Sequence, residues 1–395
     1  MIHFNRPCMT GKETEYIRQA VETGKLSGNG EFTHRCQDFF QQRYGFKKCL
    51  LTTSCTDALE MAALLTGVGP GDEVIVPSYT FVSSALAFVR TGATIVFADS
   101  CADQPNIDAE KIEALITPRT KVIVPVHYAG CACDMDKIMA IAEAHNLLVV
   151  EDAAQAVDSW YKVEVGSGSG TKEVKNRPLG SVGHLGCFSF HETKNITAGG
   201  EGGMLVINDE RFLRRAEILW EKGTNRAEFF RGEVNKYGWV DTGSSFLPSE
   251  INAAYLWAQC ENLDVIQAER KRIWLRYRDE LEKIVGVGQW NIKFPIVPEG
   301  ATNNAHMFYM LFPDLEKRTE FIAKMRAKDI LTPFHYLPLH SSQFILHCPT
   351  PTSHSHLSLP NCDRYADTLV RLPLYYGLAP DQDRVIEAVK ESLAG

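Results

Sequence analysis

The sequence predicts an α/β protein with a mostly parallel central sheet flanked by helices and a smaller C-terminal α+β domain. From residue 48 onward, short runs rich in Val and Ile alternate with helical segments. These runs lack a clean polar–apolar alternation, which is typical of strands buried on both faces. Strand–helix alternation implies right-handed crossovers between parallel strands. The chain has 395 residues, 45% of them hydrophobic, which suffices for a large core and more than one domain.

The first half of the chain supplies most of the predicted sheet. We expect strands at 47–54, 72–78, 93–99, 120–128 and 147–154, each followed or preceded by helices at 55–67, 81–92, 108–116 and 134–146. Gly67 closes the first of these helices, because glycine commonly occupies the position after a helix C-terminus. Two further strands are expected at 183–190 and 202–208.

The second half of the chain has a different pattern of predicted elements. A long helical region is predicted at 248–284, followed by an apolar run at 305–312, a helix at 315–328 and a last helix at 380–394. We therefore expect a large domain at 1–250 and a small domain at 251–395, with the N-terminal segment packing against the small domain. Residues 161–181 contain Gly-Ser-Gly-Ser-Gly, a linker-like composition that predicts a surface loop or hairpin.

Composition argues against several classes of protein. No run of about 18 apolar residues is present, so no membrane-spanning helix is expected, and the first residues do not resemble a secretory signal. The net charge is −8 without a basic cluster, which makes nucleic acid an unsuitable partner. The 11 cysteines are scattered, and the close pair Cys131 and Cys133 has no second pair to complete a zinc site. We expect reduced thiols in the cytoplasm.

Polar or aromatic residues follow four of the predicted strands. They occupy 52–56, 77–81, 127–130 and 151–155. Because ligands bind at the carboxyl ends of parallel strands, these segments should converge on one site.

Three of these segments carry side chains with two interpretations each. Asp152 after a buried strand is either a structural cap or a carboxylate that meets a metal, a helix N-terminus or a cationic ligand. The hydroxyls of 52–56 are either an ordinary helix cap or part of a phosphate site at a helix N-terminus. Phe81 is either core packing or an exposed aromatic plate.

Lys194, in the stretch "FSFHETKNITAGGEGG", favours the ligand-binding interpretations over the structural ones. Alone it is a solvated surface charge. Between a buried strand and glycines that admit close backbone approach, it fits a dry pocket, where desolvation lowers the pKa of an amine and makes it nucleophilic. A phosphate cradle, an aromatic plate, a carboxylate and an activated lysine are the four groups that pyridoxal 5'-phosphate (PLP) requires.

Five motifs together resemble the sugar aminotransferases of the DegT/DnrJ/EryC1/StrS family: "EDAAQ", "CFSFHETKN", "GGEGG", "PSYTF" and "VPVHYAG". The resemblance implies the fold-type I architecture of aspartate aminotransferase over nearly the whole chain. Five stretches, "GKLSGNGEFTHRC", "FHETKN", "EKGTNR", "FFRG" and "FHYLPLH", are similar to the subgroup that makes dTDP-4-amino-4,6-dideoxygalactose.

The resemblance implies roles for individual residues around PLP. Lys194 is the Schiff-base lysine, Asp152 pairs with the pyridine nitrogen, Gln155 lies near the phenolic oxygen and Phe81 stacks on the ring. The phosphate-binding residues are Ser54, Cys55, Thr56 and Ser189. Ser245 stands where many members have the Asn that reaches the partner subunit's phosphate, so this contact is an open question.

Further residues are matched to the sugar substrate. They are Lys25, His191, His335, Tyr336 and His340. Glu192 shares the subgroup motif with His191, and His127 either touches the cofactor or supports its loop. For a histidine, a hydrogen-bonded structural role is an equally ordinary alternative.

The implied reaction is transfer of the amino group of L-glutamate to C4 of dTDP-4-keto-6-deoxyglucose by a cytoplasmic homodimer with shared active sites. The product would serve surface polysaccharides such as lipopolysaccharide or enterobacterial common antigen. Lysine at 194 disfavours the dehydratases of the family, which carry His there. Two alternatives remain: a transaminase for another keto sugar, 3-keto or GDP-linked, and a non-catalytic protein of the same fold. The set Lys194, Asp152 and Gln155 argues against the latter.

Overall fold

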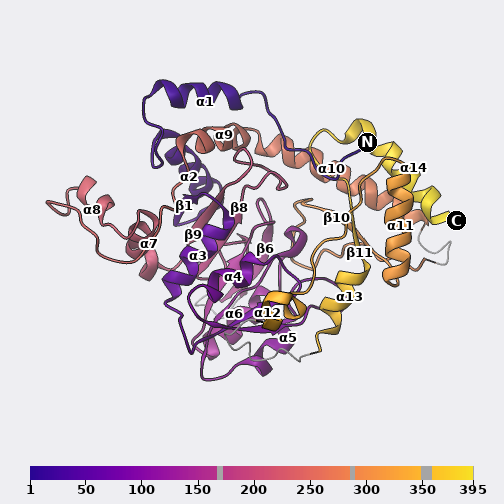
Figure 1. The fold of residues 1–395 in the computed structure, drawn as a ribbon, viewed down its shortest axis with the longest axis horizontal. Helices are drawn as coiled ribbons and strands as arrows, with labels where there is room; N and C mark the ends of the chain where they lie inside the picture. The colour runs from indigo at the N-terminus through magenta and orange to yellow at the C-terminus, as the bar shows by residue number, and fades with distance from the viewer. Residues whose placement is uncertain (167–171, 285–289, 348–357, 395) are drawn as a thin grey trace.

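A seven-stranded sheet forms the centre of the computed structural model, which describes residues 1–166, 172–284, 290–347 and 358–394 (Figure 1). The strand order is β1-β9-β8-β5-β4-β2-β3. The strands are β1 (Lys48–Thr52), β2 (Glu73–Pro77), β3 (Thr94–Ala98), β4 (Thr120–Ile123), β5 (Leu148–Asp152), β8 (Leu185–Ser189) and β9 (Gly203–Ile207). Only β9 runs antiparallel to its neighbours, so the predicted mostly parallel sheet is confirmed.

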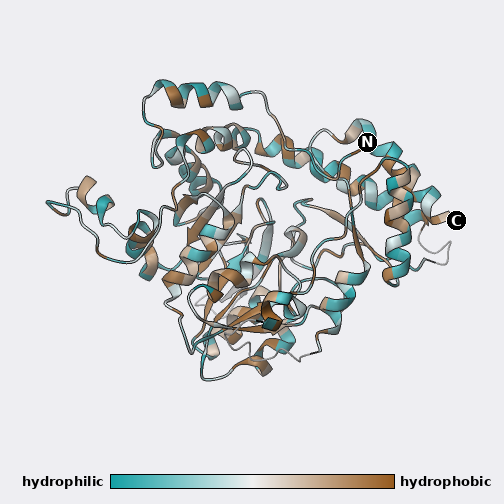
Figure 2. Ribbon diagram, in the orientation of Figure 1, coloured by the Kyte–Doolittle hydropathy of each residue, from teal (hydrophilic) through white to brown (hydrophobic). Residues whose placement is uncertain are grey.

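Successive residues of each strand enter two different cores. In β2, Val74 and Val76 belong to one core, and Ile75 belongs to the other, on the opposite face of the sheet. All three side chains are fully buried. This arrangement explains the continuous apolar runs, because a strand covered on both faces has no polar side. Figure 2 shows apolar stretches along the central strands and mixed colours on the surrounding helices.

Helices cover both faces of the sheet. One core includes side chains of α3 (Cys55–Thr66), α4 (Ser83–Val89) and α7 (Leu213–Trp220). The opposite core includes α1 (Glu13–Glu22), α2 (Glu31–Tyr44), α5 (Ala109–Ile112), α6 (Met135–Ala144) and α9 (Glu250–Glu261). The short α8 (Arg226–Phe230) lies on an arm that projects from the body in Figure 1.

A third core lies around a two-stranded antiparallel sheet of β10 (Phe308–Leu311) and β11 (Leu369–Leu372). Around it lie α10 (Leu263–Leu281), α11 (Leu315–Ala327) and α14 (Gln382–Ala394). The helix α13 (Pro360–Thr368) contacts β10 and α11, but its buried apolar side chains and Ile345 of α12 (Gln343–His347) belong to the core that includes α3. Ile2 belongs to the third core and pairs with Ile330, so the N-terminal segment packs against the C-terminal elements. No helix in the described part of the chain is long and apolar enough to cross a membrane.

The linker-like segment forms a hairpin, as one of the two predictions for it proposed. β6 (Trp160–Gly166) pairs with β7 (Lys172–Pro178) in antiparallel register. Residues 167–171, which hold most of the Gly-Ser run, lie outside the described residues. The hairpin is tied to the C-terminal half by the Lys162 N–H, which donates to the Gly300 carbonyl at 2.9 Å.

Glu151 anchors the chain that returns from this hairpin. Its buried carboxylate accepts hydrogen bonds from the backbone N–H groups of Gly180 and Val182, at 2.8 and 2.7 Å, and from that of Gly183. It also accepts one from Nε2 of His127 at 2.9 Å, since Nδ1 of that ring accepts from the Cys133 N–H. The neighbouring residue is Asp152, so Glu151 fixes the strand end on which the candidate site depends.

We expect Glu151→Ala to lower the free energy of unfolding by about 3 kcal/mol, because it leaves several buried N–H groups without an acceptor. Urea unfolding followed by circular dichroism measures this change. Glu143→Ala, at an exposed position of α6, is the matched control and should fall within about 0.5 kcal/mol of wild type. Equal stabilities of the two variants would contradict the anchoring role.

Candidate active site

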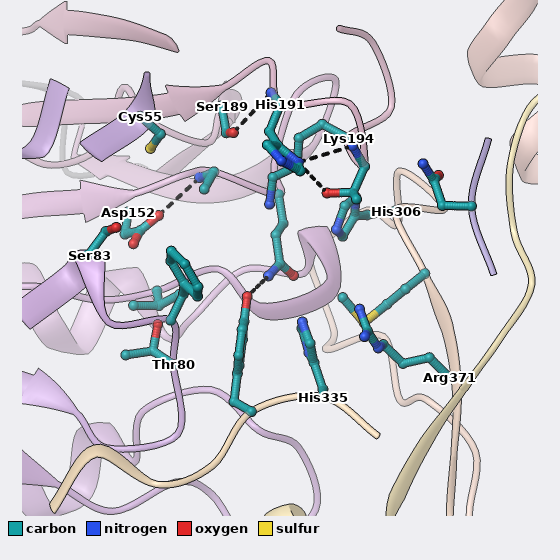
Figure 3. Close-up of a pocket in the computed structure, with 18 of the residues that line it drawn as sticks. Cys55, Thr80, Ser83, Asp152, Ser189, His191, Lys194, His306, His335 and Arg371 are labelled. Carbon is teal, nitrogen blue, oxygen red and sulfur yellow. Dashed lines mark hydrogen bonds between the residues drawn. The ribbon is translucent and has the colours of Figure 1, made fainter. Parts of the chain in front are cut away.

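A cavity of about 660 Å³ opens at the carboxyl ends of the central strands (Figure 3). It is lined by segments from both halves of the chain. Eleven of the predicted site residues line it: Ser54, Cys55, Thr56, Phe81, Asp152, Gln155, Ser189, His191, Lys194, His335 and Tyr336. The strand-end segments therefore converge, as the parallel sheet requires.

The N-terminus of α3 forms one wall of the cavity. Ser54 caps this helix, since its Oγ accepts the Asp57 N–H at 3.1 Å. The first N–H groups of a helix have no partner within the helix, and they point toward an anion placed there. The hydroxyls of Thr56 and Ser83 lie 2.7 Å apart, and Ser189 adds a third hydroxyl. The helix-cap interpretation is confirmed for Ser54, and the anion-site interpretation of this turn stays a prediction.

Asp152 is a buried carboxylate without a positive partner. Its side chain accepts the Ser84 hydroxyl at 2.6 Å and the Ala154 N–H at 3.1 Å, and Thr80 donates to Ser84 at 2.9 Å. Burial raises the pKa of Asp152, while these hydrogen bonds and the charge of Lys194 oppose that rise. No ion pair in the described part of the chain includes Asp152. A buried charge in this state fits a cationic ligand.

Lys194 extends into the cavity from the loop after β8 (Figure 3). Within the described residues, its Nζ has neither a hydrogen bond nor an ion pair. Burial lowers the pKa of this amine, and the nearby Cys55 and Asp152 partly offset the effect. A lowered pKa increases the neutral fraction, and the neutral amine is the nucleophile and the base.

Phe81 lies at the cavity with 55% of its surface exposed, so the alternative of core packing is wrong. Its ring centre is 6.2 Å from that of Tyr336. An exposed ring at the edge of a cavity is available to stack on a flat ligand.

Gln155 holds the opposite part of the lining in place. Its Oε1 accepts the Ala129 N–H at 2.7 Å, and its Nε2 donates to the Tyr336 hydroxyl at 3.0 Å. Tyr336 in turn stacks on His335 with ring centres 3.5 Å apart, and His335 Nδ1 bonds the Tyr128 hydroxyl at 2.6 Å. The sequence motif "FHYLPLH" is thus connected to the strand end that carries Gln155.

Other predicted residues lie elsewhere. His340 is buried against Ser78, 2.7 Å from its Oγ, and does not line the cavity. Lys25 and Ser245 line a second cavity of about 510 Å³, next to α8. His127 is fully buried and supports its loop through the bonds described above. Glu192 is exposed beside His191.

Several residues of this site were not predicted from the sequence, and three of them bear on its chemistry. Ser84 bonds Asp152, and His306 and Arg371 line the cavity from the C-terminal half. The serine pair after "PSYTF" was a usable signal for Ser84. The local sequence gives no such signal for His306 and Arg371, because their position at the cavity depends on how the two halves of the chain pack together.

The comparisons with known proteins agree with this geometry. The sequence matches the DegT/DnrJ/EryC1/StrS aminotransferase family over residues 7–390. The chain belongs to this family. This aminotransferase is 34% identical over 401 residues to the spore coat polysaccharide biosynthesis protein SpsC of Bacillus subtilis, covering 99% of this chain and 97% of SpsC. It is 34% identical over 393 residues to the GDP-perosamine synthase of Caulobacter vibrioides, covering 98% and 97%.

A solved structure adds the cofactor. The PMP form of Spr1654 from Streptococcus pneumoniae superposes with a TM-score of 0.85 at 26% identity, covering 98% of each chain, and a PLP form is also known. The predicted fold of PLP-dependent aminotransferases and the predicted cofactor are therefore confirmed. The cavity fits this cofactor. Hydroxyl groups of Thr56, Ser83 and Ser189 line it near the start of α3, and within the described residues Asp152 forms no ion pair and Lys194 Nζ has no hydrogen-bond or ion-pair partner.

Proposed function

We propose that this sugar aminotransferase transfers the amino group of L-glutamate to C4 of dTDP-4-keto-6-deoxy-D-glucose, giving dTDP-4-amino-4,6-dideoxy-D-galactose for surface polysaccharide synthesis. The observation that carries the proposal concerns two residues of one cavity. Among the described residues, Lys194 Nζ has no hydrogen-bond or ion-pair partner, and the buried Asp152 forms no ion pair. The acceptor sugar rests on the subgroup motifs, which include "FHETKN" and "FHYLPLH".

In this proposal, different residues contact each part of the cofactor. Lys194 would bond PLP covalently, and Asp152 would keep the pyridine nitrogen protonated through a charge-assisted hydrogen bond. Gln155 would lie at the phenolic oxygen and Phe81 would cover the ring. The phosphate is held by Ser54, Cys55, Thr56 and Ser189. When bound, the cofactor supplies an electron sink for negative charge at the substrate carbon.

Lys194 is the group that moves protons in this proposal. With PLP bound, the neutral Nζ of Lys194 would take a proton from Cα of the amino donor and, in the second half of the reaction, would give a proton to C4 of the sugar. Burial, which depresses the pKa of Lys194, favours the neutral amine needed for the first step. His191, His335 and Tyr336 line the space that remains for the sugar.

The second cavity supports a homodimer with shared sites. Lys25 and Ser245 line it together with basic residues of the arm that carries α8. This arm exposes large apolar side chains, including Trp239 at 83% and Phe230 at 69%. Such exposure is typical of a protein interface. We infer that Ser245 of one subunit completes the phosphate site of the other and that Lys25 faces the nucleotide.

We place the boundary between the large and small domains near residue 250, with α9 still packing in the core of the large domain, and we propose that the protein is cytoplasmic. Each of the ten cysteines that the structure describes is a free thiol, which supports a reducing compartment.

The turn at Ser54 gives a direct test of the phosphate site. A Cβ atom on Gly203 would lie 2.3 Å from the carbonyl of Ser54 and 2.4 Å from the Cys55 nitrogen. Because both contacts are backbone atoms, Gly203→Ala must displace the turn, and we expect the affinity for PLP to fall by about 10-fold or more. Spectroscopic titration of the apoprotein measures the affinity. Gly69→Ala, whose Cβ would meet nothing closer than 3.8 Å, should bind like wild type; a Gly203→Ala protein with unchanged affinity would place the phosphate elsewhere.

The acceptor is tested by incubating the protein with L-glutamate and candidate keto sugars and assigning the product by NMR. We expect amination at C4 of the dTDP-linked sugar. Amination at C3 would refute the assignment of position. The similarity to a GDP-perosamine synthase makes a GDP-linked keto sugar the competing substrate, and its preferential use would refute the nucleotide.

A further inference from the structure

His306 contributes a hydrogen-bond acceptor without a partner to the wall of the active-site cavity. It lines the cavity from the C-terminal half, beside Lys194 in Figure 3, and the residue is only 8% exposed. Nδ1 of its ring lies 2.9 Å from Oδ1 of Asn195, the residue after Lys194. Within the described residues, Nε2 of the same ring has no hydrogen-bond partner. A buried polar atom in this state is unfavourable unless a ligand meets it.

The surrounding hydrogen bonds determine which nitrogen of the His306 ring carries the proton. The side-chain amide nitrogen of Asn195 donates to the backbone carbonyl of Asn304 at 2.8 Å, and a carbonyl can only accept. Oδ1 of Asn195 therefore faces His306 and accepts from its Nδ1. Burial, together with the positive charges of Lys194 and Arg270, holds the pKa of the ring well below its ordinary value, so the ring is neutral. A neutral ring protonated at Nδ1 has a lone pair at Nε2, which accepts and does not donate.

The backbone that carries His306 is held in an unusual conformation. Ala305 has a φ of 53°, in the left-handed region that residues other than glycine rarely adopt. Oδ1 of Asn303 accepts the N–H of Ala305 at 2.8 Å, and Oδ1 of Asn304 accepts that of the next residue at 3.0 Å. The buried guanidinium of Arg270 donates to the carbonyls of Ala305 and His306, at 3.2 and 2.7 Å. Strained backbone of this kind is typical of functional sites, so we take the placement of this ring as functional.

The groups next to the reacting carbon determine which donor can meet Nε2. In the proposed reaction, C4 of the keto sugar must approach Lys194, and His306 lies beside that lysine. C4 of a 4-keto-6-deoxy sugar has two neighbours in the ring: C3, which carries a hydroxyl, and C5, which carries a methyl group and the ring oxygen. The C3 hydroxyl is therefore the only donor on a neighbouring carbon.

The other two histidines of the cavity are less suited to this contact. Nδ1 of His191 accepts the N–H of Thr193 at 3.2 Å, and its Nε2 lies 3.6 Å from the carboxylate of Glu201. Nδ1 of His335 lies 2.6 Å from the hydroxyl of Tyr128, which can either donate or accept. Neither ring offers an acceptor that its own hydrogen bonds define.

We propose that Nε2 of His306 accepts a hydrogen bond from the C3 hydroxyl of the keto sugar and so selects a 4-keto sugar that carries this hydroxyl. The inference rests on the proposed function, since it assumes amination at C4. His306 acts here as a binding residue for the sugar, and Lys194 remains the group that moves protons.

The first test needs no variant. It compares the dTDP-linked keto sugar with its 3-deoxy analogue as acceptors for wild-type protein and L-glutamate. We expect kcat/KM for the analogue to be lower by about 10-fold or more, because the buried Nε2 is then left without a donor. Equal kcat/KM for the two sugars would overturn the inference.

The second test removes the acceptor and keeps the bond to Asn195. In His306→Asn, the amide nitrogen takes the place of Nδ1 and still donates to Asn195, but no atom replaces Nε2. We expect the KM for the keto sugar to rise by about 10-fold or more, while the loss of the visible band of PLP-loaded protein with L-glutamate proceeds as in wild type. His306→Gln, whose Oε1 can accept at the place of Nε2, should have a smaller effect. The reverse order of the two variants would assign His306 to positioning Asn195 and would overturn the inference.

Binding of the sugar can also be measured apart from turnover. PLP-loaded protein that has not met glutamate holds no amino group to transfer, so calorimetric titration with the keto sugar reports binding alone. His306→Asn should weaken this binding by about 10-fold. The matched control is His184→Asn. Burial also lowers the pKa of His184, and its Nδ1 accepts the Val149 N–H at 2.9 Å, but it lies outside the cavity, so this variant should bind the sugar like wild type.

Failure of this inference is distinguishable from failure of the proposed function. His306→Asn protein with wild-type KM and wild-type binding of the sugar would overturn the inference alone. Wild-type protein that aminates no keto sugar, or that aminates C3, would overturn the proposed function together with the inference.

Discussion

Lys194→Ala is expected to reduce amino transfer by at least about 10³-fold, because it removes both the covalent attachment of PLP and the group that moves the proton. The purified variant should also lose the visible band that arises from the lysine-bound cofactor. Steady-state turnover with L-glutamate and the keto sugar, together with an absorption spectrum, measures both effects. Its fold should persist, since Nζ has no partner within the described residues.

The control for this variant is Lys121→Ala. Lys121 is an exposed lysine of β4, and its removal should leave turnover and spectrum unchanged. Lys194→Ala protein that keeps a tenth of wild-type turnover would show that another group carries the proton.

Asp152→Asn should lower the turnover number by about 10²- to 10³-fold. The amide has nearly the same shape but cannot hold a proton on the pyridine nitrogen by charge, so the ring loses its strength as an electron sink. Ser84→Ala is the matched comparison, because it removes a 2.6 Å hydrogen bond to Asp152 and leaves the carboxylate in place. We expect a loss of about 10-fold from that variant. Asp152→Asn and Ser84→Ala proteins with equal turnover would contradict the role of the charge.

The sheet could be predicted from sequence because its strands carry a strong signal. Val74, Ile75 and Val76 are apolar in succession since they serve two cores, and each strand of this type was placed within a few residues. β4 ends at Ile123, earlier than predicted. Beyond it, Pro125 cannot donate to a ladder, and only an isolated bridge from Val126 to Asp152 continues the pairing.

Site residues could be predicted from the sequence where a residue type that PLP requires directly follows a buried strand. Asp152 and Lys194 follow buried strands, so the topology of the sheet brings them to one edge. Phe81 was ambiguous because its exposure depends on what packs above it. Arg371 and His306 come from segments more than 100 residues away in sequence, and no local pattern shows that they face Lys194.

Lys25 and Ser245 show a different limit. Their motifs pointed to the substrate and the cofactor phosphate, yet within one chain they line a separate cavity. Residues that act across a subunit interface cannot meet their target in a single chain. In the proposed homodimer, the subunit interface would bring the two cavities together.

The assignment of Lys194 as the residue that carries PLP is tested most directly by reducing the purified, PLP-loaded protein with sodium borohydride. The modified peptide is then mapped by mass spectrometry. We expect the reduced cofactor to be attached to the peptide that contains Lys194. Attachment to a different lysine, or no covalent attachment despite bound PLP, would contradict this assignment.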